Sequence, residues 1–134
     1  MTSVFLDSGI FVALLNRRDR WHEQAVTLFG GTKPKWSTSL LVVSEAYAWF
    51  LHRMGEEAAR TFRQCLGNLA GLKVYEATVD HHQHVLKTLD HFRGTKLTYV
   101  DASSLCLLER HKIRCVWSTD HHLGISGVAV LPRS

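Results

Sequence analysis

The sequence predicts an α/β fold with a mostly parallel β-sheet. Short apolar runs of strand length alternate with longer amphipathic runs of helix length, and turn residues separate them. The sequence contains neither internal repeats nor low-complexity tracts. The 134 residues, 46% of them hydrophobic, suffice for one domain with a hydrophobic core. We therefore expect a single domain over residues 1–134.

The apolar periodicity gives the order of the elements. We expect strands at residues 3–6, around Trp36, and at 72–76, 113–118 and 128–131, and helices at residues 9–15, 20–29, 39–52, 55–69, 78–92 and 98–111. Clusters of turn residues at 30–34 and 93–96 mark loops, and a Gly-containing loop precedes the last strand. Because parallel connections are almost always right-handed, helices should cover both faces of the sheet.

Each assignment has a local signal. Residues 4–6 are apolar, and we expect residues 3–6 to form a buried strand that ends at Asp7. The helix at 39–52 is apolar nearly all round, which predicts extensive burial. Gly55 opens a more polar helix, and the helix at 78–92 is rich in His. Thr98 and Asp101 have the spacing of a capping box, which starts the last helix.

Charge and composition give weaker indications. Lys and Arg total 16 and Asp and Glu 12, so the net charge is +4 and the pI about 9.2, which slightly favours an anionic partner such as nucleic acid.

The N-terminus does not resemble a signal peptide and no apolar run is long enough to cross a membrane, so we expect a cytoplasmic protein without a membrane partner. Cys65, Cys106 and Cys115 form no C-x-x-C pair and are expected to be buried, reduced thiols.

Four acidic residues lie within or directly after apolar segments, unlike the other charges, which fall on polar faces. They are Asp7, Glu45, Asp101 and Asp120. Each has a structural alternative. Asp7 could cap a helix, Glu45 could lie on a narrow solvent-facing stripe, Asp101 could belong only to its capping box, and Asp120 could serve a turn.

One shared role explains all four acids. The carboxyl ends of parallel strands meet at one edge of a sheet, so the four side chains could form one pocket. Carboxylates that lie so near to one another would raise one another's pKa values. A divalent cation would remove the repulsion between their charges. Oxygen ligands select hard cations, chiefly Mg²⁺ or Mn²⁺.

These segments resemble the PIN-domain nucleases, and within them the VapC-type toxins and their solitary relatives. The resemblance covers essentially the whole chain. Its motifs are Phe5-Leu6-Asp7-Ser8, Val43-Ser44-Glu45, Leu97-Thr98-Tyr99-Val100-Asp101-Ala102-Ser103-Ser104 and Trp117-Ser118-Thr119-Asp120-His121-His122-Leu123. Each motif is short, but their order and spacing together are specific.

The resemblance implies a three-layer α/β/α sandwich around a five-stranded parallel sheet. It also implies Mg²⁺ or Mn²⁺ at the four acids and hydrolysis of RNA to 5′-phosphate and 3′-hydroxyl ends. Asp7 and Asp101 are the expected direct ligands, and Glu45 and Asp120 bind directly or through water. The hydroxyls of Ser8 and Thr119 match supporting positions. A homodimer and an antitoxin partner are further implications.

Basic and aromatic residues must hold the RNA, because the acids repel it. The candidates for backbone contacts are Arg17, Arg18, Arg20, Arg93, Lys96, Arg110, Lys112 and Arg114, and those for base stacking are Trp21, His121 and His122. For any single one, a solvated surface position is the competing interpretation, or a core position for Trp21.

Four other interpretations compete with this one. His81, His82, His84 and His91 share one helix, so they cannot converge on one zinc ion and are expected on a solvated face. A phospho-acceptor signalling domain would usually carry an acidic pair after the first strand, and a haloacid-dehalogenase-type phosphatase would need an Asp where Gly9 stands. A PIN fold that only binds RNA or protein would not need all four acids.

Overall fold

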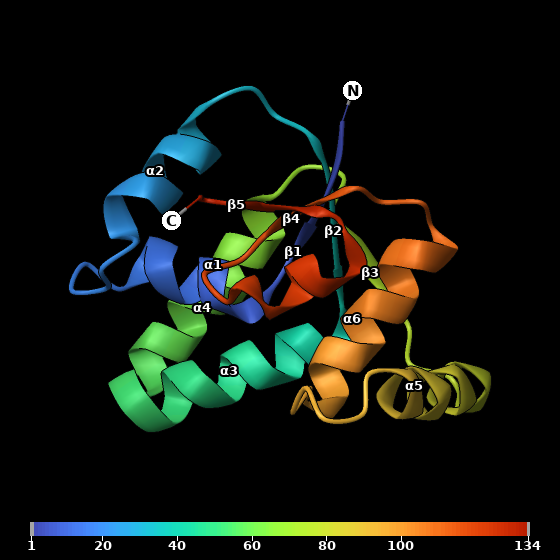
Figure 1. Ribbon diagram of the computed structural model, residues 1–134. Helices are drawn as coiled ribbons and strands as arrows, with labels where there is room; N and C mark the ends of the chain where they lie inside the picture. Colours follow the sequence, from blue (N-terminus) through green and yellow to red (C-terminus); the bar gives the residue numbers. More distant parts are fainter. Residues whose placement is uncertain (1, 134) are drawn as a thin grey trace.

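A five-stranded, fully parallel sheet forms the centre of the molecule (Figure 1). The computed structural model describes residues 2–133. The strands are β1 (Ser3–Leu6), β2 (Lys35–Ser39), β3 (Lys73–Tyr75), β4 (Cys115–Trp117) and β5 (Ala129–Leu131). Their order across the sheet is β3-β2-β1-β4-β5, so the chain moves outward to β3 and then crosses back to β4.

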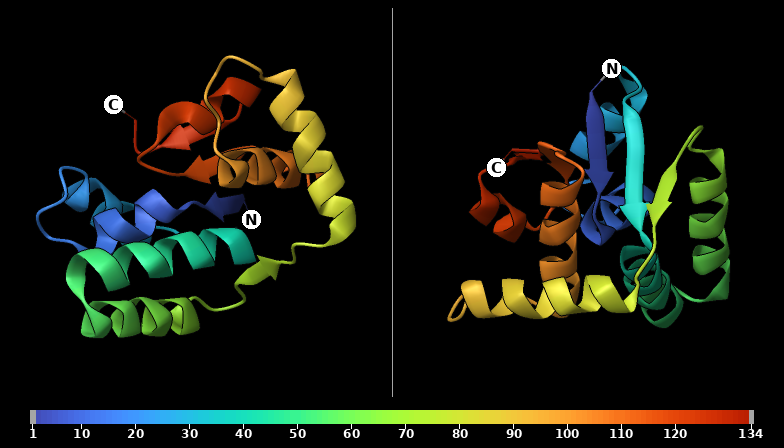
Figure 2. Two further views of the ribbon diagram at one scale, coloured as in Figure 1. Left: turned by 90° about the horizontal axis from the view of Figure 1, so that it is seen from below. Right: turned by 90° about the vertical axis from the view of Figure 1, so that its right-hand side faces the viewer.

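Helices cover both faces of this sheet, which confirms the predicted α/β sandwich. The helices are α1 (Ser8–Leu15), α2 (His22–Gly30), α3 (Leu40–Met54), α4 (Glu56–Asn68), α5 (Val79–His91) and α6 (Tyr99–Arg110), with a 3₁₀ helix η1 (His121–Ser126). Figure 2 shows α4 and α6 on opposite sides of the strands. The reversal of direction after β3 causes this division, because right-handed crossovers that run in opposite directions lie on opposite faces.

Aromatic side chains fill the core on the α1–α4 side. The rings of Phe11 and Phe50 both pack on Phe62, with centroids 5.2 and 5.3 Å apart. Phe5, a residue of β1, is also fully buried. These rings bring α1, α3 and α4 together and fix where α1 and α3 begin relative to the sheet.

The structure corrects two sequence-based expectations about the elements. The segment before β5 was expected to be a loop, but residues 121–126 form η1. The helix at 39–52 was expected to be apolar and buried nearly all round, yet Leu40 and Tyr47 are exposed. The reason is that α3 contacts α1 and α4 on one side, which leaves its other side open.

Two further observations concern the cysteines and membrane spans. The three cysteines are free, as expected, but they are half-buried and not fully buried. Within residues 2–133, helices are too short or too polar for a membrane crossing.

Candidate active site

The carboxyl ends of the two central strands lie side by side. Leu6 of β1 pairs with Trp117 of β4, and the backbone N–H of Asp7 donates to the Trp117 carbonyl over 3.1 Å. Asp7 and the segment leading to Asp120 therefore leave the sheet at the same edge. Helix α6, which carries Asp101 in its first turn, contacts both α3 and η1 there.

Asp7 is the most buried of the four acids, with 4% of its surface exposed. It occupies the N-cap position of α1, but its side chain makes no capping bond to this helix within the described chain. Its Oδ2 instead accepts a hydrogen bond of 2.7 Å from Ser118 Oγ. The carboxylate is thus bonded to the segment that follows β4, and helix capping does not account for it.

The surroundings of Asp7 disfavour its charge. Burial raises its pKa from 3.8 to about 6, and the negative charges of Glu45 and Asp101 act in the same direction. Hydrogen bonds from the Ser118 hydroxyl and the Ser8 backbone lower the pKa by less. A carboxyl group held in this way is one that a bound cation would stabilise in its charged form.

Ser118 links two of the acids, and the sequence analysis missed it. Its Oγ donates to Asp7 and accepts a 3.0 Å hydrogen bond from the backbone N–H of Asp120. The supporting residue expected from the resemblance was Thr119, which lies so close to α1 that a Cβ on Gly9 would stand 2.4 Å from its Oγ1. The alternation of side chains along an extended segment could have identified Ser118, since it lies two residues before Asp120.

Glu45 is exposed but is oriented by a neighbour. Ser8 Oγ donates to Glu45 Oε1 over 2.5 Å, so the hydroxyl next to Asp7 reaches the second acid. Both residues line a pocket of about 620 Å³ whose other walls include Asp19 and Thr119.

The same pocket contains two basic residues that were not among the sequence-based candidates. His52 and Arg53 lie seven and eight residues after Glu45 and line the pocket with it. This spacing places them on the same face of α3 as Glu45, which is the signal that could have identified them.

Asp101 and Asp120 form a second part of the site. Asp101 is 8% exposed and completes the predicted capping box: its backbone N–H donates to Thr98 Oγ1 over 3.1 Å, and its Oδ2 accepts from the Thr98 N–H at 3.3 Å. One ligand atom each from Asp101, Asp120 and His122 lies within 4.8 Å of the others. Among residues 2–133 this is the one such set of three, and Asp7 and Glu45 lie outside it.

The donor chemistry of these residues fits a hard divalent cation. Four carboxyl groups could supply oxygen ligands, and the pKa of Asp7, raised first by burial and less by the charges of Glu45 and Asp101, means that a cation would stabilise its charged form. The capping box and the two serine hydroxyls fix three of the carboxyl groups, which are those of Asp101, Asp7 and Glu45.

The candidate RNA-binding residues fall into separate places. Arg17, Arg18 and Arg20 are exposed in the α1–α2 loop, whose Asp19 lines the pocket with Glu45. Arg93 and Lys96 are exposed in the α5–α6 loop.

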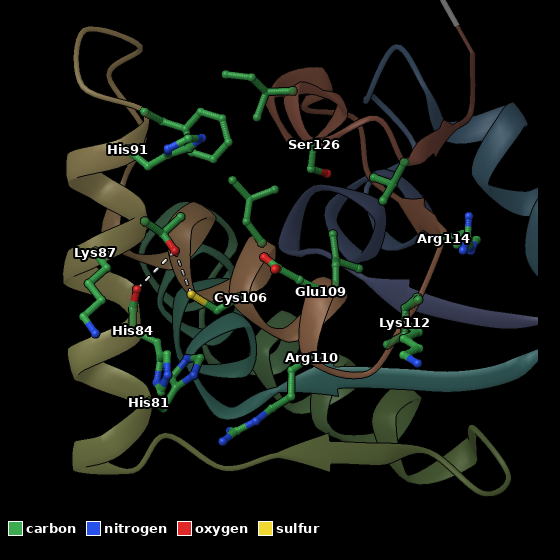
Figure 3. A pocket seen from close by; sticks show the side chains of 17 residues that line it. His81, His84, Lys87, His91, Cys106, Glu109, Arg110, Lys112, Arg114 and Ser126 are labelled. Atoms are coloured by element: carbon green, nitrogen blue, oxygen red, sulfur yellow. Dashed lines mark hydrogen bonds between the residues drawn. The ribbon is translucent and has the colours of Figure 1, made fainter.

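The other three basic candidates, Arg110, Lys112 and Arg114, line a different groove of about 1130 Å³ along α5 and α6 (Figure 3). The four acids do not line this groove. The basic candidates are therefore divided among three places, and only the α1–α2 loop borders the pocket that contains Glu45.

The aromatic candidates and the histidine-rich helix also separate. Trp21 packs on His121 with ring centroids 5.7 Å apart, whereas His122 is exposed beside Asp120. On α5, the expectation of a solvated face was wrong for His81. It is buried, and its Nε2 forms a 2.6 Å hydrogen bond with Ser103 Oγ, because α5 packs across α6.

Comparison with known protein families identifies the family of this chain. A profile of the PIN domain matches residues 4–127, which is most of the chain. The chain belongs to the PIN-domain family. No match was found among curated protein sequences.

Solved structures share the fold of this PIN domain. Mycobacterium tuberculosis VapC20, described as a sarcin–ricin loop cleaving toxin, superposes with a TM-score of 0.86 at 22% identity, covering 94% of this chain and 96% of VapC20. A toxin–antitoxin complex from Klebsiella pneumoniae gives 0.69 at 15% identity, covering 96% and 95%. VapBC-1 from nontypeable Haemophilus influenzae gives 0.64 at 14% identity, covering 96% of each chain.

Proposed function

We propose that this PIN domain is a divalent-metal-dependent endoribonuclease that acts as the toxin of a toxin–antitoxin pair. The observation that best supports the proposal is the surroundings of Asp7: the charges of Glu45 and Asp101 raise its pKa, and Ser118 joins its carboxylate to the backbone of Asp120. Burial and neighbouring charge hold the pKa of Asp7 at about 6, so a cation bound beside this carboxyl group would stabilise its charged form. The positively charged chain as a whole suits a polyanionic substrate.

The four acids, Asp7, Glu45, Asp101 and Asp120, would hold Mg²⁺ or Mn²⁺. Such an ion lowers the pKa of water and neutralises the charge that develops on a phosphodiester during hydrolysis. Ser118 orients Asp7 and the backbone before Asp120, and Ser8 orients Glu45. Neither a Ser nor a Cys nucleophile is required.

Basic residues around the pocket would bind the RNA backbone. Arg53 lines the same pocket as Glu45, and the α1–α2 loop with Arg17, Arg18 and Arg20 borders it through Asp19. These side chains would offset the repulsion between phosphates and the acidic cluster.

The toxin assignment rests on the structural relatives. VapC20 is described as a toxin, and two of the other similar structures are toxin–antitoxin assemblies. We extend this to an antitoxin partner and a homodimer for the present chain. A gene for a small DNA-binding protein directly upstream of its own gene would support the pairing.

Substitution of Asp7 tests the catalytic proposal. Asp7→Asn should abolish Mn²⁺-dependent, EDTA-sensitive cleavage of RNA, because it removes the charge while keeping the acceptor for Ser118. Induced expression of the wild type should arrest bacterial growth, and expression of the variant should not. Asp90→Asn is the matched control: it makes the same change on the exposed end of α5 and should retain cleavage. Full EDTA-sensitive activity in purified Asp7→Asn would refute the proposal.

A further inference from the structure

We propose that His122 supplies a nitrogen ligand to the metal centre, so that the site prefers Mn²⁺ over Mg²⁺. This rests on the proposed function in one respect, which is that the acidic cluster binds a divalent cation. It adds a ligand type that the four acids alone would not provide.

The geometry brings His122 to the acids. His122 Nδ1 lies 3.7 Å from Asp120 Oδ1, and one ligand atom from each of Asp101, Asp120 and His122 lies within 4.8 Å of the others. Ligand bonds to a small divalent ion are about 2.1 Å, so two donors on one ion can be up to about 4.2 Å apart. A movement of a few tenths of an ångström by exposed side chains would close the set around an ion.

The backbone holds two members of the set in place. The N–H of His122 donates to Asp120 Oδ1 over 3.0 Å, which fixes the Asp120 carboxylate at the start of η1 with the imidazole beside it. Asp101 is held by its capping box and is more than nine-tenths buried. Within residues 2–133 its recorded hydrogen bond engages Oδ2 only, which leaves Oδ1 available as a ligand.

The two neighbouring histidines differ in availability. The ring of His121 is occupied: its Nε2 is 3.0 Å from the Pro132 carbonyl and the ring packs on Trp21. The ring of His122 is 60% exposed, and in the described part of the chain its one polar contact is with Asp120. The imidazole of His122 is therefore available beside the acids, whereas the imidazole of His121 is held by other contacts.

Imidazole changes the metal preference of a carboxylate site. Mg²⁺ binds oxygen and keeps much of its water, whereas transition metals accept imidazole nitrogen readily. A site with two carboxylates and one imidazole should thus favour Mn²⁺ relative to Mg²⁺. Its His122→Ala variant should lose this advantage while keeping the four acids.

Pulsed electron paramagnetic resonance of Mn²⁺ bound to the full chain tests the proposal directly. Wild type should show ¹⁴N coupling from a directly bound imidazole, His122→Ala should lose it, and His121→Ala should retain it. In calorimetric titrations, the ratio of Mn²⁺ to Mg²⁺ affinity should fall by about tenfold or more in His122→Ala, since even outer-shell partners change metal affinity by about 10- to 100-fold.

The outcomes separate this proposal from the proposed function. Mn²⁺ binding without ¹⁴N coupling, and with the same Mn²⁺ to Mg²⁺ ratio in His122→Ala, overturns the ligand role while the carboxylate centre stands. Weaker RNA binding by His122→Ala in that case would assign the ring to the substrate. Failure of wild type to bind Mn²⁺ at all would overturn both proposals.

Discussion

At the scale of single residues, the surroundings of Asp7 shift its pKa in opposite directions. Burial and the charges of Glu45 and Asp101 raise its pKa, while hydrogen bonds from Ser118 and Ser8 lower it. The result, a pKa of about 6, means that the folded protein holds a proton on Asp7 more tightly than the unfolded chain does. At neutral pH, the charged form of Asp7 therefore destabilises the folded protein when no metal is bound. It is the same charged form that the proposed site needs.

This gives a prediction about pH and stability. Between pH 4 and 6 the folded state binds more protons than the unfolded state, so the free energy of unfolding should fall as pH rises through this window. The shift from 3.8 to about 6 corresponds to about 3 kcal/mol above pH 7. In EDTA, Asp7→Asn should therefore be more stable than wild type by up to that amount at pH 8, with no gain at pH 4. Urea unfolding at both pH values measures this, and a pH-independent difference would contradict it.

The residue scale also shows what the sequence could not reveal. The acids were recognisable because charge within apolar segments is costly and therefore conspicuous. Ser118 and His81 were not recognised, because their partners, Asp7 and Ser103, are 111 and 22 residues away in the chain. A hydroxyl or an imidazole suits a surface as well as a core, so its role depends on contacts that only the tertiary structure defines.

At the scale of elements, the sequence predicted the bounds and the start of α6 well, but it did not predict how α6 packs against α5. The capping box is local, so Thr98 and Asp101 sufficed to predict it. The packing of α5 on α6 is not local. It pairs His81 with Ser103 and Thr88 with Cys106, and it leaves Ser104 Oγ buried with no hydrogen-bond partner among the described residues.

The two adjacent serines of α6 should respond in opposite ways to removal of the hydroxyl. Ser104→Ala removes an unpaired buried group, which costs about 1–3 kcal/mol when unsatisfied, so stability should rise or stay unchanged. Ser103→Ala, the matched control, leaves His81 buried without its partner and should lower stability by about 1–3 kcal/mol. Thermal unfolding of both variants tests this. An equal loss in the two would indicate that Ser104 has an unrecognised partner.

At the scale of the whole molecule, topology explains why the site exists. The sequence predicted parallel strands and helices on both faces, and strand direction explains why the segments of Asp7 and Asp120 leave the sheet at one edge. Glu45 and Asp101 lie on helices α3 and α6, so their positions also depend on how these helices pack. The groove along α5 and α6 could not be predicted, since it depends on how far α5 stands from η1. Periodicity specifies which face of a helix is buried but not how far that helix lies from its neighbours.

The acidic cluster should make the stability of the whole fold depend on metal. In the proposed site, folding would bring together carboxyl groups that the unfolded chain keeps apart, so a cation that binds only the folded state would stabilise it. At a concentration of 100 times its Kd, Mn²⁺ should add about 2.7 kcal/mol, which corresponds to a rise in Tm of roughly 5–10 °C for a domain of this size.

The same reasoning predicts how variants differ in this response. Asp7→Asn should begin from a higher Tm in EDTA and gain less from Mn²⁺, because the repulsion that the ion relieves is already reduced. Asp90→Asn, on the exposed end of α5, should gain as much as wild type. Differential scanning calorimetry with and without Mn²⁺ makes the comparison. Equal gains in wild type and Asp7→Asn would mean that the ion stabilises the protein somewhere other than the edge where β1 and β4 end.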